Sequence, residues 1–147
     1  FGVGTKMGTS SDQPALDTAY KLCGYAGTPR MKLAPEKSNL PGRKQLVRQY
    51  EDGTAVRDVI ATDADDGHAG ALLLNRVMVD GNRTEAGASR PIGAHREHAA
   101  ARLAELPDSL TDPTIDHAPY EVEISDRMQE RRDETRATLK ETMGVEE

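Results

Sequence analysis

The sequence predicts an α+β protein, and two observations carry that prediction. Between residues 19 and 80, short runs of apolar residues alternate with turn-forming residues, which is typical of a small, mostly antiparallel sheet. After Pro91 the apolar residues instead recur at helical spacing, over about 91–106 and again over 126–143. We therefore expect a small sheet followed by two C-terminal helices.

The strands are predicted from runs of apolar and β-favouring residues bounded by turn residues. Five segments fit that description: 19–25, 30–33, 44–50, 56–61 and 71–79. The turns expected to join or close them are Gly27-Thr28-Pro29, Glu51-Asp52-Gly53 and Asp80-Gly81. Tyr120 to Ile124 alternates like one further short strand.

The two helices have recognisable ends. Ile92, Ala99, Leu103 and Leu106 share one helical face, and Pro107 ends that helix because proline cannot continue it. Residues 108–119 then form an irregular connector. In the last helix Ser125 is a good N-terminal cap, and Gly144 follows the C-terminal end. Its apolar stripe is narrow: Met128, Thr135, Leu139 and Met143.

The chain has few apolar residues for its length of 147 residues. Only 36% of the residues are hydrophobic and 3% aromatic, and there is no tryptophan. Charged residues make up 30%. We expect the chain to rest against another surface, either upstream residues of a longer protein or a second subunit.

Charge and cysteine content exclude several function classes. The net charge of −6 argues against a nonspecific nucleic-acid binder and against binding to an anionic membrane. It fits both ordinary acidic solubility and adaptation to a salty cytoplasm. Cys23 is the only cysteine, so no internal disulfide or cysteine-based zinc site is expected, and we interpret it as a small buried residue in a reducing, cytoplasmic compartment. No signal peptide or membrane-spanning apolar run is present.

The histidines do not predict a metal site. His95 and His98 lie three residues apart on one predicted helix, but no third ligand accompanies them. The segment 63–68 imitates a calcium loop, yet its glycine is misplaced and the acidic twelfth residue is missing. We expect a solvated helix surface and a turn, respectively.

Two segments carry the composition of an anion-binding site. Phe1-Gly2-Val3-Gly4-Thr5 resembles a strand end that opens into a turn, where backbone N–H groups and the threonine hydroxyl can hold a phosphate. It matches neither the P-loop nor the dinucleotide fingerprint, and a tight turn is the alternative. The cations Lys37, Arg43 and Lys44 surround Leu40-Pro41-Gly42, which fits either phosphate binding or an ordinary surface loop.

Taken together, four segments resemble nicotinate phosphoribosyltransferase: Phe1–Thr5, Ala19–Leu22, Arg30–Leu33 and Leu40–Gln45. In that family a phosphate-loop Phe-Gly-Val-Gly-Thr is followed by Tyr-Lys-Leu, by a Lys-Leu strand and by Leu-Pro-Gly-Arg-Lys-Gln. The resemblance implies that the chain is the C-terminal part of a larger enzyme. Residues 1–18 would be the end of an irregular α/β barrel with its phosphate loop, and 19–147 a C-terminal domain.

The resemblance also implies a reaction and a site. The enzyme would join nicotinate to phosphoribosyl pyrophosphate, with coupled ATP hydrolysis and magnesium, and would act as a homodimer. Gly2, Gly4 and Thr5 would bind the substrate phosphate, and Lys6, Arg43 and Lys44 are further candidates. The family's phosphorylated histidine and its nicotinate-binding arginine lie upstream of the phosphate loop. No catalytic residue is therefore expected in this chain, which would be inert alone.

Two alternatives stay open on the sequence. A sister phosphoribosyltransferase would use nicotinamide or quinolinate, because the base-recognition residues lie upstream. A noncatalytic anion-binding or assembly module would use the same turns without any chemistry. A folded, monomeric chain would favour that second alternative.

Overall fold

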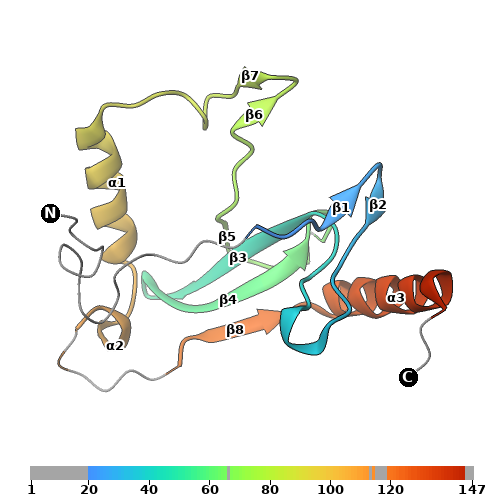
Figure 1. Cartoon of the computed structure of the whole chain (residues 1–147). Coiled ribbons are helices and arrows are strands. Elements are labelled where there is room, and N and C mark those ends of the chain that lie inside the picture. Colours follow the sequence, from blue (N-terminus) through green and yellow to red (C-terminus); the bar gives the residue numbers. More distant parts are fainter. Residues whose placement is uncertain (1–19, 66, 113, 115–118, 145–147) are drawn as a thin grey trace, which may run out of the picture.

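A computed structural model describes residues 20–65, 67–112, 114 and 119–144 (Figure 1). These residues form a mixed α/β structure with three small sheets and three α-helices, and they contain no closed barrel. The expected end of a barrel, residues 1–18, lies outside the described part of the chain, so the division into two domains stays a prediction. Among the described residues no helix combines the length and the apolar character needed to cross a bilayer.

A long hairpin forms the centre of the largest sheet. Strand β3 (Lys44–Glu51) pairs antiparallel with β4 (Thr54–Thr62), with one irregularity of register at Gln49/Tyr50. The turn between them places Asp52 at φ 47° and Gly53 at φ 82°, the two consecutive left-handed residues that suit the twist of a tight hairpin. Both strands and their turn lie where the sequence predicts them.

Two shorter strands complete this sheet, in the order β5-β3-β4-β8. Strand β5 (Ala71–Leu72) pairs antiparallel with β3, and β8 (Glu121–Ile124) pairs parallel with β4. The mostly antiparallel character is confirmed. The expectation that one sheet lies within residues 19–80 is wrong, because β8 joins it from the C-terminal half and two small hairpins form sheets of their own.

The last helix, α3 (Asp126–Met143), begins directly after β8. The backbone N–H of Ser125 donates to Ile60 O at 3.0 Å, so the sheet pairing extends to the cap residue itself. The Ser125 hydroxyl accepts from the N–H of Met128 at 3.3 Å, and Gly144 ends the helix at φ 62°. Both predicted helix ends are confirmed, because cap and terminator chemistry are local properties.

The core is small and lies between the hairpin and the first turns of α3. Five buried apolar side chains form it within the described part of the chain: Val47, Ala55, Val59, Ala61 and Met128. Of the stripe predicted for α3, Met128 and Thr135 are buried, whereas Met143 is exposed. The small number of buried apolar side chains is consistent with the low apolar content of the sequence.

An ion pair ties three strands together on one side of this sheet. The Arg48 guanidinium donates to both carboxylate oxygens of Asp58, at 2.8 Å each, across the β3–β4 pairing. The Tyr120 hydroxyl, just before β8, donates to Asp58 Oδ1 at 3.1 Å, and the Arg48 guanidinium lies 5.9 Å from the centre of the Tyr120 ring. The hydrogen bonds from Arg48, the larger effect, and from Tyr120 hold the pKa of Asp58 below its usual value.

Residues 75–104, which we call the arm, extend away from the four-stranded sheet (Figure 1). The arm contains the two-stranded hairpin β6 (Met78–Val79) and β7 (Asn82–Arg83), followed by helix α1 (Ile92–Leu103). The predicted turn at Asp80-Gly81 closes that hairpin. A short helix, α2 (Asp108–Thr111), follows in the segment that we expected to be irregular.

The strand predicted over 71–79 is wrong, because the chain leaves the sheet after Leu72. Leu73 N still donates to Leu46 O at 2.9 Å. The side-chain amide of Gln45 then takes the place of a neighbouring strand, accepting from Leu74 N at 2.9 Å and donating to Leu74 O at 3.0 Å. An apolar run indicates extended structure, but it does not say where the partner strand ends.

The first two predicted strands shrink to a short hairpin, β1 (Gly24–Tyr25) and β2 (Thr28–Pro29). Its turn is formed by Ala26 at φ 49° and Gly27 at φ 76°, two residues rather than the three expected. Residues 30–33 are not a strand, because within the described residues no neighbouring strand pairs with them. A single 3-10 turn, Pro35–Lys37, lies in the loop that follows.

Met128 is expected to be the most sensitive side chain of the core. Met128→Ala removes a fully buried side chain between α3 and the hairpin, and such truncations destabilise by about 2–5 kcal/mol. Urea unfolding followed by circular dichroism measures the change. Met143→Ala, in the same helix but 64% exposed, should change the free energy of unfolding by less than about 0.5 kcal/mol. Equal effects of the two substitutions would contradict this core.

The Asp58 ion pair is expected to make stability depend on pH in one direction. A carboxylate whose folded pKa is lowered contributes stability above its unfolded pKa of about 3.9 and loses it as pH falls through the folded pKa. Asp58→Asn should therefore cost on the order of 3 kcal/mol above about pH 5, and the cost should shrink below about pH 4. Unfolding in urea at several pH values tests this. The matched control is Asp52→Asn, at an exposed turn residue, for which a difference below about 0.5 kcal/mol is expected.

Candidate functional site

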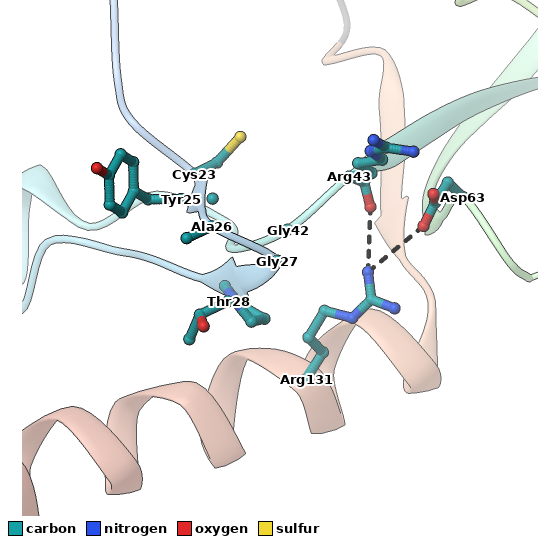
Figure 2. Close-up of a pocket in the computed structure, with 11 residues that line it drawn as sticks. Cys23, Tyr25, Ala26, Gly27, Thr28, Gly42, Arg43, Asp63 and Arg131 are labelled. Carbon is teal, nitrogen blue, oxygen red and sulfur yellow. Dashed lines mark hydrogen bonds and ion pairs between the residues drawn. The ribbon is translucent and has the colours of Figure 1, made fainter.

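A cavity of about 520 Å³ lies beside the segment Leu40–Gln45 of the family resemblance, which contributes Gly42 and Arg43 to its lining (Figure 2). It opens between the β1–β2 hairpin, the turn before β3 and the side of α3. Its lining consists of Cys23, residues 24–29, Gly42, Arg43, Asp63 and Arg131. The site therefore combines residues from the beginning, the middle and the end of the described chain.

A backbone hydrogen bond holds the β1–β2 hairpin against the turn before β3. The Cys23 carbonyl oxygen accepts from Gly42 N at 2.6 Å, which fixes the hairpin against the turn at residues 40–43. The same oxygen accepts from Arg30 N at 3.0 Å, which extends the pairing within the hairpin. Gly42 adopts φ 75°, and a Cβ there would lie 3.0 Å from Arg131 Nη1. Glycine adopts that backbone conformation without strain, and any other side chain would also displace the Arg131 side chain slightly. The Leu-Pro-Gly-Arg-Lys-Gln segment thus favours glycine at this position, chiefly for its backbone conformation.

Arg131 of α3 lines one side of the cavity and contacts two other lining residues, Arg43 and Asp63. Its Nη1 donates to the Arg43 carbonyl oxygen at 3.1 Å and lies 3.7 Å from Asp63 Oδ1, as the dashed lines in Figure 2 show. In the sequence, Arg131 is one of several arginines on a charged helix. No local signal separates it from its neighbours, and only its contacts across the fold identify it.

The two candidate cations at the turn have different surroundings. The Lys44 ammonium donates to the carbonyl oxygens of Leu40 at 2.8 Å and Gly42 at 2.7 Å, so its charge holds the turn. Arg43 is exposed, and Figure 2 shows its side chain directed away from Arg131. A second cavity, of about 730 Å³, shares Arg43 and extends along residues 74–80. Lys44 also lines this second cavity, but Arg43 is the more exposed of the two cations and lines both cavities.

The other candidate residues are distributed as follows. Gly2, Gly4, Thr5 and Lys6 lie outside the described residues, so their role stays a prediction. Cys23 is half-buried and lines both cavities, which corrects the expectation of a buried residue: its carbonyl binds the turn, and its side chain is left at the cavity edge.

The histidines are placed as the sequence predicts. His95 and His98 are exposed on α1, and His68 Nε2 lies 3.3 Å from Asp65 Oδ2 within a local turn. Within the described ranges no group of three or more His, Cys, Asp or Glu side chains is arranged to hold a metal ion. We accordingly assign magnesium to none of these residues.

The different roles of Lys44 and Arg43 can be tested by measuring the free energy of unfolding of variants at each position. Lys44→Met removes two hydrogen bonds from a charged donor to the turn, and we expect a loss of about 1.5–3 kcal/mol in the free energy of unfolding. Arg43→Met, at the adjacent exposed position, should stay within about 0.5 kcal/mol of the wild type. Chemical denaturation of the two variants makes the comparison. A larger loss for Arg43→Met would reverse the assignment.

No protein-family model matches the chain. Several individual proteins do. A nicotinate phosphoribosyltransferase of Mycobacterium tuberculosis is 37% identical over 128 residues, which is 87% of this chain and 27% of that protein. The human nicotinate phosphoribosyltransferase is 44% identical over 63 residues, or 41% of this chain and 12% of the relative.

A third relative has the same name. The nicotinate phosphoribosyltransferase of Dictyostelium discoideum is 41% identical over 68 residues, 44% of this chain and 12% of the relative. The chain thus spans about a quarter, or less, of the length of the relatives it matches. The resemblance stated from the four sequence segments is therefore confirmed: the chain is similar to part of several nicotinate phosphoribosyltransferases, consistent with a C-terminal fragment.

Proposed function

We propose that this chain is the C-terminal part of a nicotinate phosphoribosyltransferase that serves NAD biosynthesis and salvage. The observation that carries the proposal is the 37% identity to the Mycobacterium tuberculosis relative over 87% of the chain. A match over 128 of 147 residues extends well beyond the short motifs. The parent protein would join nicotinate and phosphoribosyl pyrophosphate to give nicotinate mononucleotide and pyrophosphate.

The proposed chemistry places clear demands on the protein. The nicotinate nitrogen forms a bond to the anomeric carbon while the bond from that carbon to the pyrophosphate oxygen breaks. Positive charge develops on the sugar, so positioning of the reactants and electrostatic stabilisation supply most of the rate. Binding of the 5-phosphate at a fixed site contributes to positioning, because it aligns the ribose without contacting the reacting atoms.

We assign the binding of the 5-phosphate to the segment Phe1–Thr5. The backbone N–H groups at Gly2 and Gly4 and the Thr5 hydroxyl are the donors that suit a phosphate, and Lys6 can add charge. Arg43 is the described residue that best fits a further anion contact, because its guanidinium is exposed at the edge of two cavities. Lys44 acts indirectly in this proposal, since its ammonium is engaged by the carbonyl oxygens of the turn.

Further parts of the proposal follow the family resemblance. ATP hydrolysis and magnesium would belong to the parent enzyme, and no step is assigned to them through residues of this chain. The parent is proposed to be a cytoplasmic homodimer. Because the phosphorylated histidine and the nicotinate-binding arginine of the family lie upstream, the chain by itself is expected to release no pyrophosphate.

Pyrophosphate release by the full parent protein tests this function. The protein is given phosphoribosyl pyrophosphate, magnesium and ATP, and nicotinate, nicotinamide or quinolinate is offered separately. We expect release with nicotinate alone, increased by ATP. Release only with another base would move the chain to a sister enzyme, and release with none would reject the enzymatic function. Turnover of nicotinate by the isolated 147-residue chain would contradict the assignment of the catalytic groups to upstream residues.

Two variants of the parent protein test the assigned phosphate contacts. Losing a hydrogen bond to a charged group costs about 1.5–3 kcal/mol, so Thr5→Val should lower kcat/KM for phosphoribosyl pyrophosphate roughly 10- to 100-fold. Thr9→Val, a nearby threonine without an assigned role, is the matched control and should be near wild type. Arg43→Met should act in the same direction as Thr5→Val. An unchanged dependence on that substrate would remove Thr5 from the site.

A further inference from the structure

Two exposed arginines from distant parts of the chain line the larger cavity, whose volume is about 730 Å³. Arg43 directly precedes β3, and Arg76 lies at the start of the arm. Neither side chain has a hydrogen-bond or ion-pair partner among the residues that the structure describes. Both guanidinium groups therefore keep their N–H donors for another molecule.

Positive charge predominates around this cavity, although the chain is acidic. Its lining contains three cations and two carboxylates, a net charge of +1, whereas the whole chain carries −6. One of the two carboxylates, that of Asp63, already lies 3.7 Å from Arg131 Nη1. The third cation is the Lys44 ammonium, which donates to two carbonyl oxygens and adds its charge beside the two arginines. Such a cluster attracts an anion, and guanidinium groups bind phosphate oxygens with paired N–H donors.

Hydrogen bonds fix the backbone on both walls of the cavity. On one wall, Lys44 holds the carbonyl oxygens of the turn before β3. On the other wall, the Gln45 amide binds the backbone of Leu74, and the Thr84 hydroxyl donates to Arg76 O at 2.5 Å. The two arginines therefore project from fixed backbone positions, which reduces the conformational freedom that a ligand has to remove on binding.

Apolar side chains complete the lining. Leu74 is 53% exposed, Met78 55% and Val79 40%, and all three line the same cavity as the two arginines. A bare inorganic anion gains nothing from such a surface, whereas sites for organic ligands combine apolar side chains with a few polar groups. The lining therefore fits a ligand that carries a phosphate together with an apolar ring.

We propose that this cavity binds an organic phosphate that contains an aromatic ring. Arg43 and Arg76 bind the phosphate, and Met78 and Val79 contact the ring. The proposal gives Arg76 and the two apolar residues a role in ligand binding. It rests on the proposed function only at Arg43, which serves as an anion contact in both.

Isothermal titration calorimetry of the full 147-residue chain tests the site. The probes are adenosine monophosphate, ribose 5-phosphate, which lacks the ring, adenosine, which lacks the phosphate, and inorganic phosphate. We expect adenosine monophosphate to bind roughly ten-fold more tightly than the other probes, and added salt to weaken it. Equal affinity for inorganic phosphate would overturn the role of the apolar side chains. Absence of binding at millimolar adenosine monophosphate would overturn the site as a whole.

Variants of the lining locate the binding. Arg43→Gln/Arg76→Gln removes both guanidinium groups and should raise the Kd for adenosine monophosphate roughly 10- to 100-fold. Met78→Ser should raise that Kd about three-fold or more and leave inorganic phosphate unaffected. Arg90→Gln is the matched control for loss of charge, since Arg90 is exposed but does not line the cavity, and it should bind like the wild type. An equal loss of affinity in Arg90→Gln would overturn the site.

Methionine methyl resonances in the wild-type chain give a second reading, which needs no variant. Met78 lines the cavity, whereas Met143 is 64% exposed at the end of α3 and does not line it. Adenosine monophosphate should shift the Met78 resonance with the Kd found by calorimetry and should leave the Met143 resonance in place. Binding that shifts neither resonance, or both equally, would contradict the assigned location.

Failure of this site is distinguishable from failure of the enzymatic function. Adenosine monophosphate is neither a substrate nor a product of the proposed reaction, and pyrophosphate release reports chemistry in the parent protein. Nicotinate-dependent release together with a chain that binds no adenosine monophosphate would reject the site and leave the enzyme assignment in place. Binding at Met78 without any release would do the reverse.

Discussion

The pairing of β3 with β4 is the constraint on which the rest of the described structure depends. It places Val47 and Val59 in the core, and it brings Arg48 opposite Asp58, where Tyr120 joins them ahead of β8. Strand β8 then adds to β4, and Ser125 continues that pairing into the cap of α3. The orientation of α3, and with it the position of Arg131, follows from the same hairpin. The β3–β4 pairing therefore also determines where Arg131, about 80 residues further along the chain, lines the cavity.

The core is too small to bury many of the large apolar side chains of the chain. Five apolar residues are buried among those the structure describes, while the arm and the β1–β2 hairpin leave large apolar side chains exposed. A domain of this size normally buries roughly 70% of its unfolded surface. The enzyme proposal supplies further contacts, from upstream residues of a parent protein.

The candidate site shows how a motif can serve structure and binding together. In Leu-Pro-Gly-Arg-Lys-Gln, Gly42 permits the approach of Arg131, Lys44 binds two carbonyl oxygens, and Gln45 fastens the start of the arm. Only Arg43 presents its charge outward. The resemblance to the phosphoribosyltransferases thus has a physical counterpart, because most of that segment is needed for a specific packing arrangement next to the exposed arginine.

Features that depend on neighbouring residues could be predicted from the amino-acid sequence alone. The β3–β4 hairpin follows from its apolar runs and the Asp52-Gly53 turn, and α3 from its Ser125 cap and Gly144 terminator. The short motifs also carried the family resemblance, including Arg43. These features are accessible because turn and cap preferences act over a few residues.

Contacts between elements far apart in the sequence could not be predicted in this way. Strand β8 pairs with β4 across 64 residues of sequence, for example Arg57 with Glu121. The strand predicted over 71–79 ends early where Gln45 binds the backbone of Leu74, and Arg131 of α3 contacts the turn before β3. The sequence could not separate Lys44 from Arg43, since both are cations beside the same glycine. Their difference arises from which carbonyl oxygens and cavities surround each side chain, and those neighbours are brought together by packing over long sequence distances.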